Sequence, residues 1–265
     1  MIEIIKKFIP WRRVFNRRVD KQKKSAMIGC LLKSHDLGYM FLPKTASSSL
    51  KRLIYEIEMG EPFPEDGLPG RPNFHSHQWV VRSRLGDISK AGRRMIVIRD
   101  PVKRALSAYA DKVQKKKLIS KNNLQKKRPE LIGKLPAYNP SLSVFLEFFE
   151  DYLRIQTIHH HIRPFNELLN GHDLTFFTDI FKFEYLNLAH NAIVQITSHQ
   201  GELQHTNNTN STATLADLSE SELDFLLDYY ATDYELLKGY YSPKDLKNEW
   251  RRLHNPPASS SEIPA

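Results

Sequence analysis

The 265-residue sequence contains a single cysteine, Cys30, so an internal disulfide is excluded and a reducing compartment is indicated. Long hydrophobic runs are missing as well, because none approaches the roughly 18–20 apolar residues that a membrane-spanning helix needs. The N-terminal residues also lack the apolar region and cleavage site of a secretory signal peptide. Residues 1–25 are instead predicted to form a basic leader, which either packs on the domain as a helix or makes a peripheral contact with an anionic membrane.

Glycine-rich phosphate loops are absent too. Neither G-x-x-x-x-G-K-[ST] nor G-x-G-x-x-G occurs in the sequence, which disfavours an ordinary P-loop NTPase and a dinucleotide-dependent enzyme. A nucleotide kinase-like phosphotransferase remains an alternative that predicts binding of ATP and magnesium. No acidic residue after an apolar strand suits the metal-holding role that such an enzyme needs.

What the sequence has in excess is positive charge. The formal net charge of +9 indicates an anionic partner, which could be a nucleotide, an acidic polysaccharide, nucleic acid or a membrane surface. The lysine-rich run 112–128 supports one alternative of another class, a non-enzymatic basic protein that binds nucleic acid or membranes. A hydrophobic content of 40% is enough for a sizeable core. We therefore expect a single domain over residues 26–254 and a tail over 255–265 whose composition is typical of disorder.

Residues 39–50 (YMFLPKTASSSL) predict a short apolar strand, a tight turn and the start of a helix. The helix has apolar residues on one face at the 3.6-residue period: Leu50, Leu53, Ile54 and Ile57. A helix N-terminus presents unpaired N–H groups and the positive end of the helix dipole. With Lys44 and several hydroxyl side chains beside it, this turn can cradle an anion. A serine-rich helix cap next to a surface lysine is the alternative.

A second turn of the same design follows residues 95–98, a wholly apolar run that is typical of a strand covered on both faces. Arg99 ends this run, Asp100 suits the N-cap of the next helix, and Pro101 suits its first position. Two such turns at the carboxyl ends of parallel strands would form one crevice, where ligands bind in open α/β sheets.

Other elements are predicted from shorter patterns. Strands are expected over residues 26–33 and 174–177, and an amphipathic helix begins after Ser141. Ser219 and Glu222 form a capping box for a later helix, which follows a polar loop from 199 to 214.

The two turns resemble motifs of sulfotransferases that use 3′-phosphoadenosine 5′-phosphosulfate (PAPS). Residues 43–50 (PKTASSSL) look like their 5′-phosphosulfate loop, and residues 98–109 (IRDPVKRALSAY) look like their 3′-phosphate element. The resemblance implies that Arg99 and Ser107 reach the 3′-phosphate. It also implies that the 5′-phosphosulfate is bound by the residues of the first turn: Lys44, Thr45, Ala46, Ser47, Ser48 and Ser49. Ser47 stands where glycine is frequent, although the uronyl 2-O-sulfotransferases share the sequence PKTAS.

Downstream segments are similar to carbohydrate sulfotransferases of the Golgi and their bacterial relatives. Residues 161–164 (HIRP) resemble their HWRPQ segment, with Phe165 in place of glutamine, and imply substrate contacts for His161 and Arg163. Residues 181–186 (FKFEYL) resemble their GKFETL strand, with phenylalanine in place of glycine. The resemblance covers about residues 37–240. It implies an α/β fold of three layers that resembles P-loop kinases, with a central, mostly parallel sheet flanked by helices.

The uronyl 2-O-sulfotransferases also have a YHGH segment between the two motifs, and residues 74–77 (FHSH) look similar. In that group a histidine of this segment is the catalytic base, which implies this role for His77 or, second, His75. A sugar hydroxyl needs a base whose pKa lies near the operating pH, as that of histidine does. Two loop histidines that only pack are one alternative. A zinc site with the cluster at 159–161 is another, but no accompanying cysteine or H-E-x-x-H pattern supports it, and we expect no metal.

The predicted reaction is transfer of the sulfuryl group from PAPS to a hydroxyl of a carbohydrate, with 3′-phosphoadenosine 5′-phosphate (PAP) as the other product. Lys44 would neutralise charge on the bridging oxygen as the 5′-phosphate leaves. An acidic oligosaccharide, polysaccharide, glycan or glycolipid fits the positive charge of the chain, and nucleic acid is not expected as a partner. Cytoplasmic residence, as in the bacterial relatives, is the predicted location.

Overall fold

A computed structural model describes residues 26–199 and 213–255. The predictions of a basic leader over residues 1–25 and of its membrane contact lie outside these residues. So do most of the polar loop at 199–214 and all but the first residue of the predicted tail.

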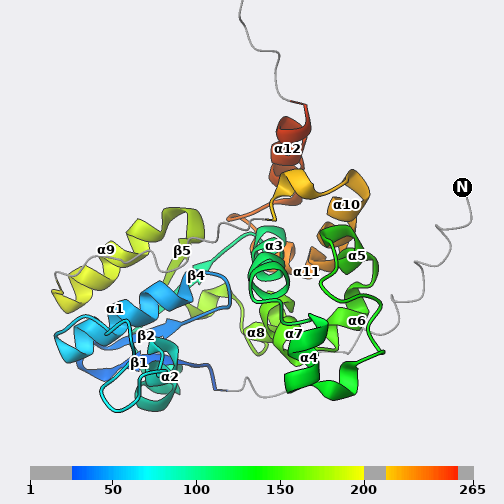
Figure 1. Cartoon of the computed structure of the whole chain (residues 1–265). Coiled ribbons are helices and arrows are strands. Elements are labelled where there is room, and N and C mark those ends of the chain that lie inside the picture. The colour runs from blue at the N-terminus through cyan, green and yellow to red at the C-terminus, as the bar shows by residue number, and fades with distance from the viewer. Residues whose placement is uncertain (1–25, 200–212, 256–265) are drawn as a thin grey trace, which may run out of the picture.

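A five-stranded sheet forms one half of the structure, with strand order β3-β1-β2-β4-β5 (Figure 1). The strands are β1 (Ile28–Leu32), β2 (Leu37–Met40), β3 (Leu85–Asp87), β4 (Arg93–Ile98) and β5 (Asp179–Lys182). β2 pairs with β4 and β4 with β5 in parallel, whereas β1 is antiparallel to both β2 and β3.

The sheet is therefore mixed, and the prediction of a mostly parallel sheet holds only for β2, β4 and β5. The reason is the connection from β1 to β2, which is the single short 3₁₀ turn η3 (Lys33–His35). A connection of this length can only reverse the chain, because parallel neighbours need a crossover of a dozen residues or more.

Helices cover both faces of the sheet. α1 (Ser47–Met59), α2 (Ser76–Ser83) and α9 (Leu186–Thr197) pack on one face, where Met95 and Val97 of β4 point. The short helix α8 (Phe165–Leu168) and the turn η4 (Ile88–Lys90) pack on the other face, against Ile96 and Ile98. Successive side chains of a strand alternate between faces, so β4 is buried on both sides, as its apolar run predicts.

The second half of the structure is helical, and α3 (Pro101–Tyr109) lies between it and the sheet (Figure 1). Its other helices are α4 (Lys121–Lys127), α5 (Leu142–Glu147), α6 (Phe149–Leu153), α7 (Gln156–Ile162), α10 (Glu220–Tyr229), α11 (Ala231–Leu236) and α12 (Pro243–His254). A core of aromatic and aliphatic side chains joins most of them to the buried face of α3. Ser141 caps α5 and the Ser219–Glu222 box caps α10, as predicted.

Two local predictions need correction. Residues 174–177 are not a strand, because the Asp173 carboxylate accepts from the Thr175 N–H and starts the 3₁₀ turn η7 (Leu174–Phe176) instead. The segment 181–186 is a strand only to Lys182 and continues as the 3₁₀ turn η8 (Phe183–Tyr185). The lysine-rich run 112–128 contains the short helix α4, which Ser120 caps.

None of the helices in the described part of the chain combines the length and the apolar character that crossing a bilayer requires.

Candidate functional site

The turn between β2 and α1 has an unusual backbone. Lys44 and Ala46 have φ angles of 69° and 58°, in the left-handed region that side chains with a Cβ seldom adopt. Thr45 between them is fully buried, and its hydroxyl donates to the carbonyl of Leu42 at 3.0 Å. Ala46 occupies the N-cap of α1, and its methyl group has no atom that can accept from the first-turn N–H groups. This geometry favours the anion cradle over the serine-capped helix.

The following serines begin α1 and differ in exposure. Ser47 is half-buried, Ser48 is exposed and Ser49 is buried. Backbone N–H groups at the start of a 13-residue helix have no partner within the helix and point along its axis, away from its body. The turn thus combines a lysine, hydroxyls and a helix N-terminus, all of which favour a bound anion.

The second turn lies directly beside the first. Arg99 follows β4, and its Nη1 donates to the carbonyl of Lys44 at 3.1 Å. Asp100 caps α3 as predicted: its carboxylate accepts from the N–H of Lys103 at 3.0 Å and from the Tyr234 hydroxyl at 2.9 Å. The two turns therefore meet at the carboxyl ends of the parallel neighbours β2 and β4, as the sequence predicts.

One hydrogen-bond donor of Arg99, its Nε, has no partner among the described residues. The guanidinium lies over the ring of Phe183, with the central carbon 4.2 Å from the ring centroid. The Nε atom itself is buried. A buried donor without a partner costs free energy, so the site fits an anionic ligand at this point. Ser107 lies two turns into α3 and is half-buried.

The sequence did not single out Asp111, yet it links this site to the lysine-rich run. Its carboxylate receives three ammonium groups, from Lys44 at 3.0 Å, Lys112 at 3.1 Å and Lys116 at 3.4 Å. The charges of Lys44 and Lys112 hold the pKa of Asp111 well below its usual range, although burial opposes them. Its position four residues after Ser107 is the signal that could have identified it, since residues four apart share a helix face.

His75 and His77 lie at the start of α2, where His75 is the N-cap. Their rings stack with centroids 5.5 Å apart, and both side chains are exposed. Partial desolvation lowers the pKa of His77, and the positive charges of Lys51, Lys116 and Lys112 lower it further. These positive charges favour the neutral form of the His77 imidazole.

The third predicted segment forms the end of α7. His161 Nδ1 hydrogen bonds to the Thr157 carbonyl at 2.8 Å, which requires the proton on Nδ1 and leaves Nε2 as an acceptor. Burial, followed by the charge of Lys112, lowers the pKa of His161 to about 3. A hollow of about 440 Å³ adjoins this helix end and is lined by Gln156, Thr157, His159, His160, His161 and Arg163.

Arg104, which the sequence also did not single out, fixes the end of α7. This fully buried side chain donates to the carbonyls of His161 at 2.9 Å, Ile162 at 3.2 Å and Arg163 at 2.6 Å. The last carbonyls of a helix have no partner within the helix, and a guanidinium supplies several donors in a fixed plane. Arg104 thereby joins α3 to the segment that holds His161.

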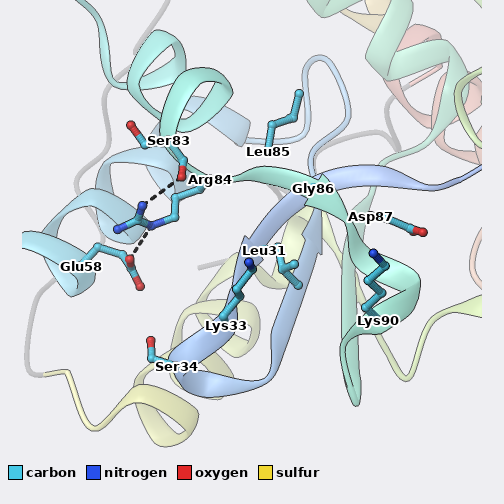
Figure 2. A pocket seen from close by; sticks show the side chains of 10 residues that line it. All are labelled: Leu31, Lys33, Ser34, Glu58, Ser83, Arg84, Leu85, Gly86, Asp87 and Lys90. Carbon is cyan, nitrogen blue, oxygen red and sulfur yellow. Dashed lines mark hydrogen bonds and ion pairs between the residues drawn. The ribbon is translucent and has the colours of Figure 1, made fainter.

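The described residues contain no candidate metal site, but they do form a second hollow. Within residues 26–199 and 213–255, no group of three or more histidine, cysteine, aspartate or glutamate side chains could hold a metal ion. A hollow of about 530 Å³ lies at the β1–β3 edge of the sheet (Figure 2). There Arg84 turns to Glu58 and to the carbonyl of Ser83, and none of the predicted site residues lines the hollow.

The chain matches the model of the sulfotransferase family over residues 31–242. That range contains both strand-to-helix turns, the histidines of α2 and the end of α7. No curated protein and no solved structure matched the chain. Because the family match extends over most of the sequence and includes every element of the site, the chain belongs to the sulfotransferase family.

Proposed function

We propose that this chain transfers the sulfuryl group from PAPS to a hydroxyl of a carbohydrate acceptor. The observation that supports the proposal most is the hydrogen bond from Arg99 Nη1 to the carbonyl of Lys44 at 3.1 Å. It joins two anion-binding turns into one site, and PAPS has two phosphate groups at separate positions of its ribose. A donor with a single phosphate chain, such as ATP, needs only one of these turns.

The β2–α1 turn binds the 5′-phosphosulfate through the backbone N–H groups and hydroxyls of residues 45–49. Lys44 stabilises the negative charge that develops on the bridging oxygen when the 5′-phosphate leaves. Arg99 and Ser107 hold the 3′-phosphate, and the unpaired Nε of Arg99 supplies a donor for it.

His77 is the base that accepts the proton of the acceptor hydroxyl. The new bond joins that oxygen to sulfur, the bond from sulfur to the 5′-phosphate oxygen breaks, and the proton moves to the imidazole. A base must be neutral before it acts, and the lowered pKa of His77 meets that requirement at pH 7. His75 is the alternative base, since its ring stacks on that of His77.

The acceptor binds beside His77 and the lysines around Asp111. His161 and Arg163 lie on the hollow at the end of α7 and extend the surface that an acceptor can contact. An acidic carbohydrate fits best, because Lys51, Lys112 and Lys116 all contribute positive charge to this space.

Calorimetric titration with PAP tests the class of donor. We expect the wild-type chain to bind PAP and Arg99→Ala to bind it about 10- to 100-fold more weakly, which is the effect of losing one charge-assisted contact. Arg93→Ala is the matched control, because Arg93 starts the same strand but pairs with Asp179 at the opposite end of the sheet. It should leave the affinity within about twofold of wild type.

The alternatives give different results in the same titration. Binding of ATP with magnesium but not of PAP would overturn the proposal in favour of a phosphotransferase. Binding of nucleic acid with a steep salt dependence, unaffected by Arg99→Ala, would favour a basic binding protein instead.

A further inference from the structure

Asp111 is the only carboxylate that pairs with Lys44 in the described part of the chain, and it lies deep in the site. Its side chain is 13% exposed and that of Lys44 is 17% exposed, so water screens the contact of 3.0 Å only partly. Lys112, in the same helical turn, and Lys116, directly after that turn, approach the same carboxylate. A carboxylate with three ammonium neighbours is more than an incidental surface ion pair.

Asp111 lies where the helix changes its winding. After α3 the chain continues as a π-helical turn, Ala110–Lys115, in which Asp111 is buried. A π turn holds one residue more than an α turn, so it rotates the residues that follow it onto a different face. Such turns occur frequently at functional sites.

We propose that Asp111 is a positioning residue that keeps the Lys44 ammonium charged and fixed over the β2–α1 turn before the sulfuryl donor binds. The inference rests on the proposed function, in which Lys44 acts on the leaving 5′-phosphate. Asp111 touches neither the donor nor the acceptor and acts only through the lysine.

The charges around Lys44 explain why it needs this partner. Burial lowers the pKa of Lys44, and the positive charges of Lys116 and Arg99 lower it further. Asp111 opposes all three through its charge and its hydrogen bond. Without that carboxylate the ammonium would lose its proton at a lower pH, and the turn would lose its cation.

Lys112 and His161 also lie near the site, but neither carries a negative charge, so neither can replace Asp111 as the partner of Lys44. Lys112 bonds to the same carboxylate and would repel Lys44 if that carboxylate were neutral. His161 is neutral at pH 7, because its pKa is about 3. Charge retention at Lys44 therefore depends on one side chain.

Titration of PAP at pH 7.5 and 9.5 tests the inference without an acceptor. In Asp111→Asn the ratio of the dissociation constant at pH 9.5 to that at pH 7.5 should exceed the wild-type ratio, because Lys44 then loses its proton at a lower pH. The increase can reach about tenfold for each unit by which the pKa of Lys44 falls. Lys51, whose pKa is about 8, also titrates between these two pH values. It does so in the wild type and in the variant, so it does not contribute to the difference between their ratios. Asp179→Asn, which removes a carboxylate from the ion pair at the other end of the sheet, should keep the wild-type ratio.

The same substitution in a Lys44→Met protein shows whether Asp111 acts through Lys44 or only supports the fold. In Lys44→Met the further change Asp111→Asn should alter the ratio by less than about twofold, because the group through which it acts is gone. Asp111→Glu retains the charge and should restore the wild-type ratio, and it also serves as the test if Asp111→Asn does not fold.

The outcomes distinguish this inference from the proposed function. A wild-type ratio in Asp111→Asn, or an equal increase in the Lys44→Met background, overturns the role of Asp111 alone. A failure of Asp111→Glu to restore the ratio does the same. A wild-type chain that does not bind PAP overturns the proposed function, and the inference falls with it.

Discussion

Replacing Arg104 with methionine should destabilise the protein strongly, because this residue joins α3 to the end of α7. The guanidinium is fully buried and donates to three carbonyls at 2.6–3.2 Å. Ile162 keeps the Tyr230 hydroxyl at 2.6 Å as a partner, but the carbonyls of His161 and Arg163 lose their donor. Methionine also removes the guanidinium that lies over the Phe165 ring, 4.8 Å from its centroid. Breaking a buried charged network of this kind costs about 3–5 kcal/mol of unfolding free energy.

The stability that Arg104→Met loses should also depend on pH. Burial raises the pKa of Asp233 to about 6, and the charge of Arg104 opposes that shift. A carboxylate whose folded pKa is raised stabilises the fold below its ordinary value of 3.8 and loses that contribution as pH rises through the folded pKa. Removing Arg104 raises the pKa of Asp233 further. The loss of unfolding free energy in Arg104→Met should therefore be smallest near pH 4 and largest near pH 7.

Urea unfolding followed by circular dichroism measures both effects. We expect a lower midpoint with an unchanged slope, and a melting temperature lower by about 10 °C. Arg94→Met is the control, because Arg94 donates to the carbonyls of Phe176 and Ala91 but is half-exposed, so water can replace it. Its cost should stay below about 1.5 kcal/mol. An Arg104→Met protein that loses less than about 1 kcal/mol would refute the reasoning.

The remaining predictions concern the site. His77→Ala should slow sulfuryl transfer by about 10²- to 10⁴-fold and leave PAP affinity unchanged, whereas His35→Ala at the opposite end of β2 should change neither the rate nor the affinity. Because the pKa of His77 is lowered, transfer should persist below pH 6.5 and fall as pH drops through that pKa. Lys51→Met should raise the pKa and move this acid limb to higher pH. Phe183→Leu should weaken PAP binding about two- to fivefold, since the Arg99 guanidinium lies 4.2 Å from the ring centroid.

Rates measured with a responsive carbohydrate acceptor and PAP titrations check these effects. An acid limb that stays in place in Lys51→Met would mean that another group titrates. If His75→Ala but not His77→Ala slows transfer, the stacked partner is the base. An unchanged PAP affinity in Phe183→Leu would remove the ring from the binding of Arg99.

Much of the site could be predicted from the sequence, because its elements are formed by interactions between residues that are close in the chain. The apolar run before Arg99, the N-cap at Asp100 and the apolar face of α1 each depend on neighbours within a few residues. Hydrogen bonds of caps and the 3.6-residue period act at that range. The positions of the two turns, and with them Lys44 and Arg99, could therefore be predicted.

The failures arise mostly from local turns and backbone breaks that an apolar pattern does not reveal. The strand predicted at 174–177 was displaced because Asp173 starts a 3₁₀ turn and Phe177 packs into the core beneath the sheet. The predicted helix after Ser141 is two helices, since the chain leaves the helical region at Phe148. The direction of β1 follows from a short turn whose length an apolar pattern does not reveal.

The sequence by itself determined the family, the two strand-to-helix turns that we propose bind phosphate, and the histidines that are candidates for the base. Only the tertiary structure decided that the carbonyl of Lys44 accepts from Arg99, 55 residues away, and that its ammonium meets Asp111, 67 residues away. The physical reason is the range of the forces. Helix caps and strand patterns are fixed by adjacent residues, but the charge state of a buried lysine is fixed by whichever groups packing brings within a few ångströms.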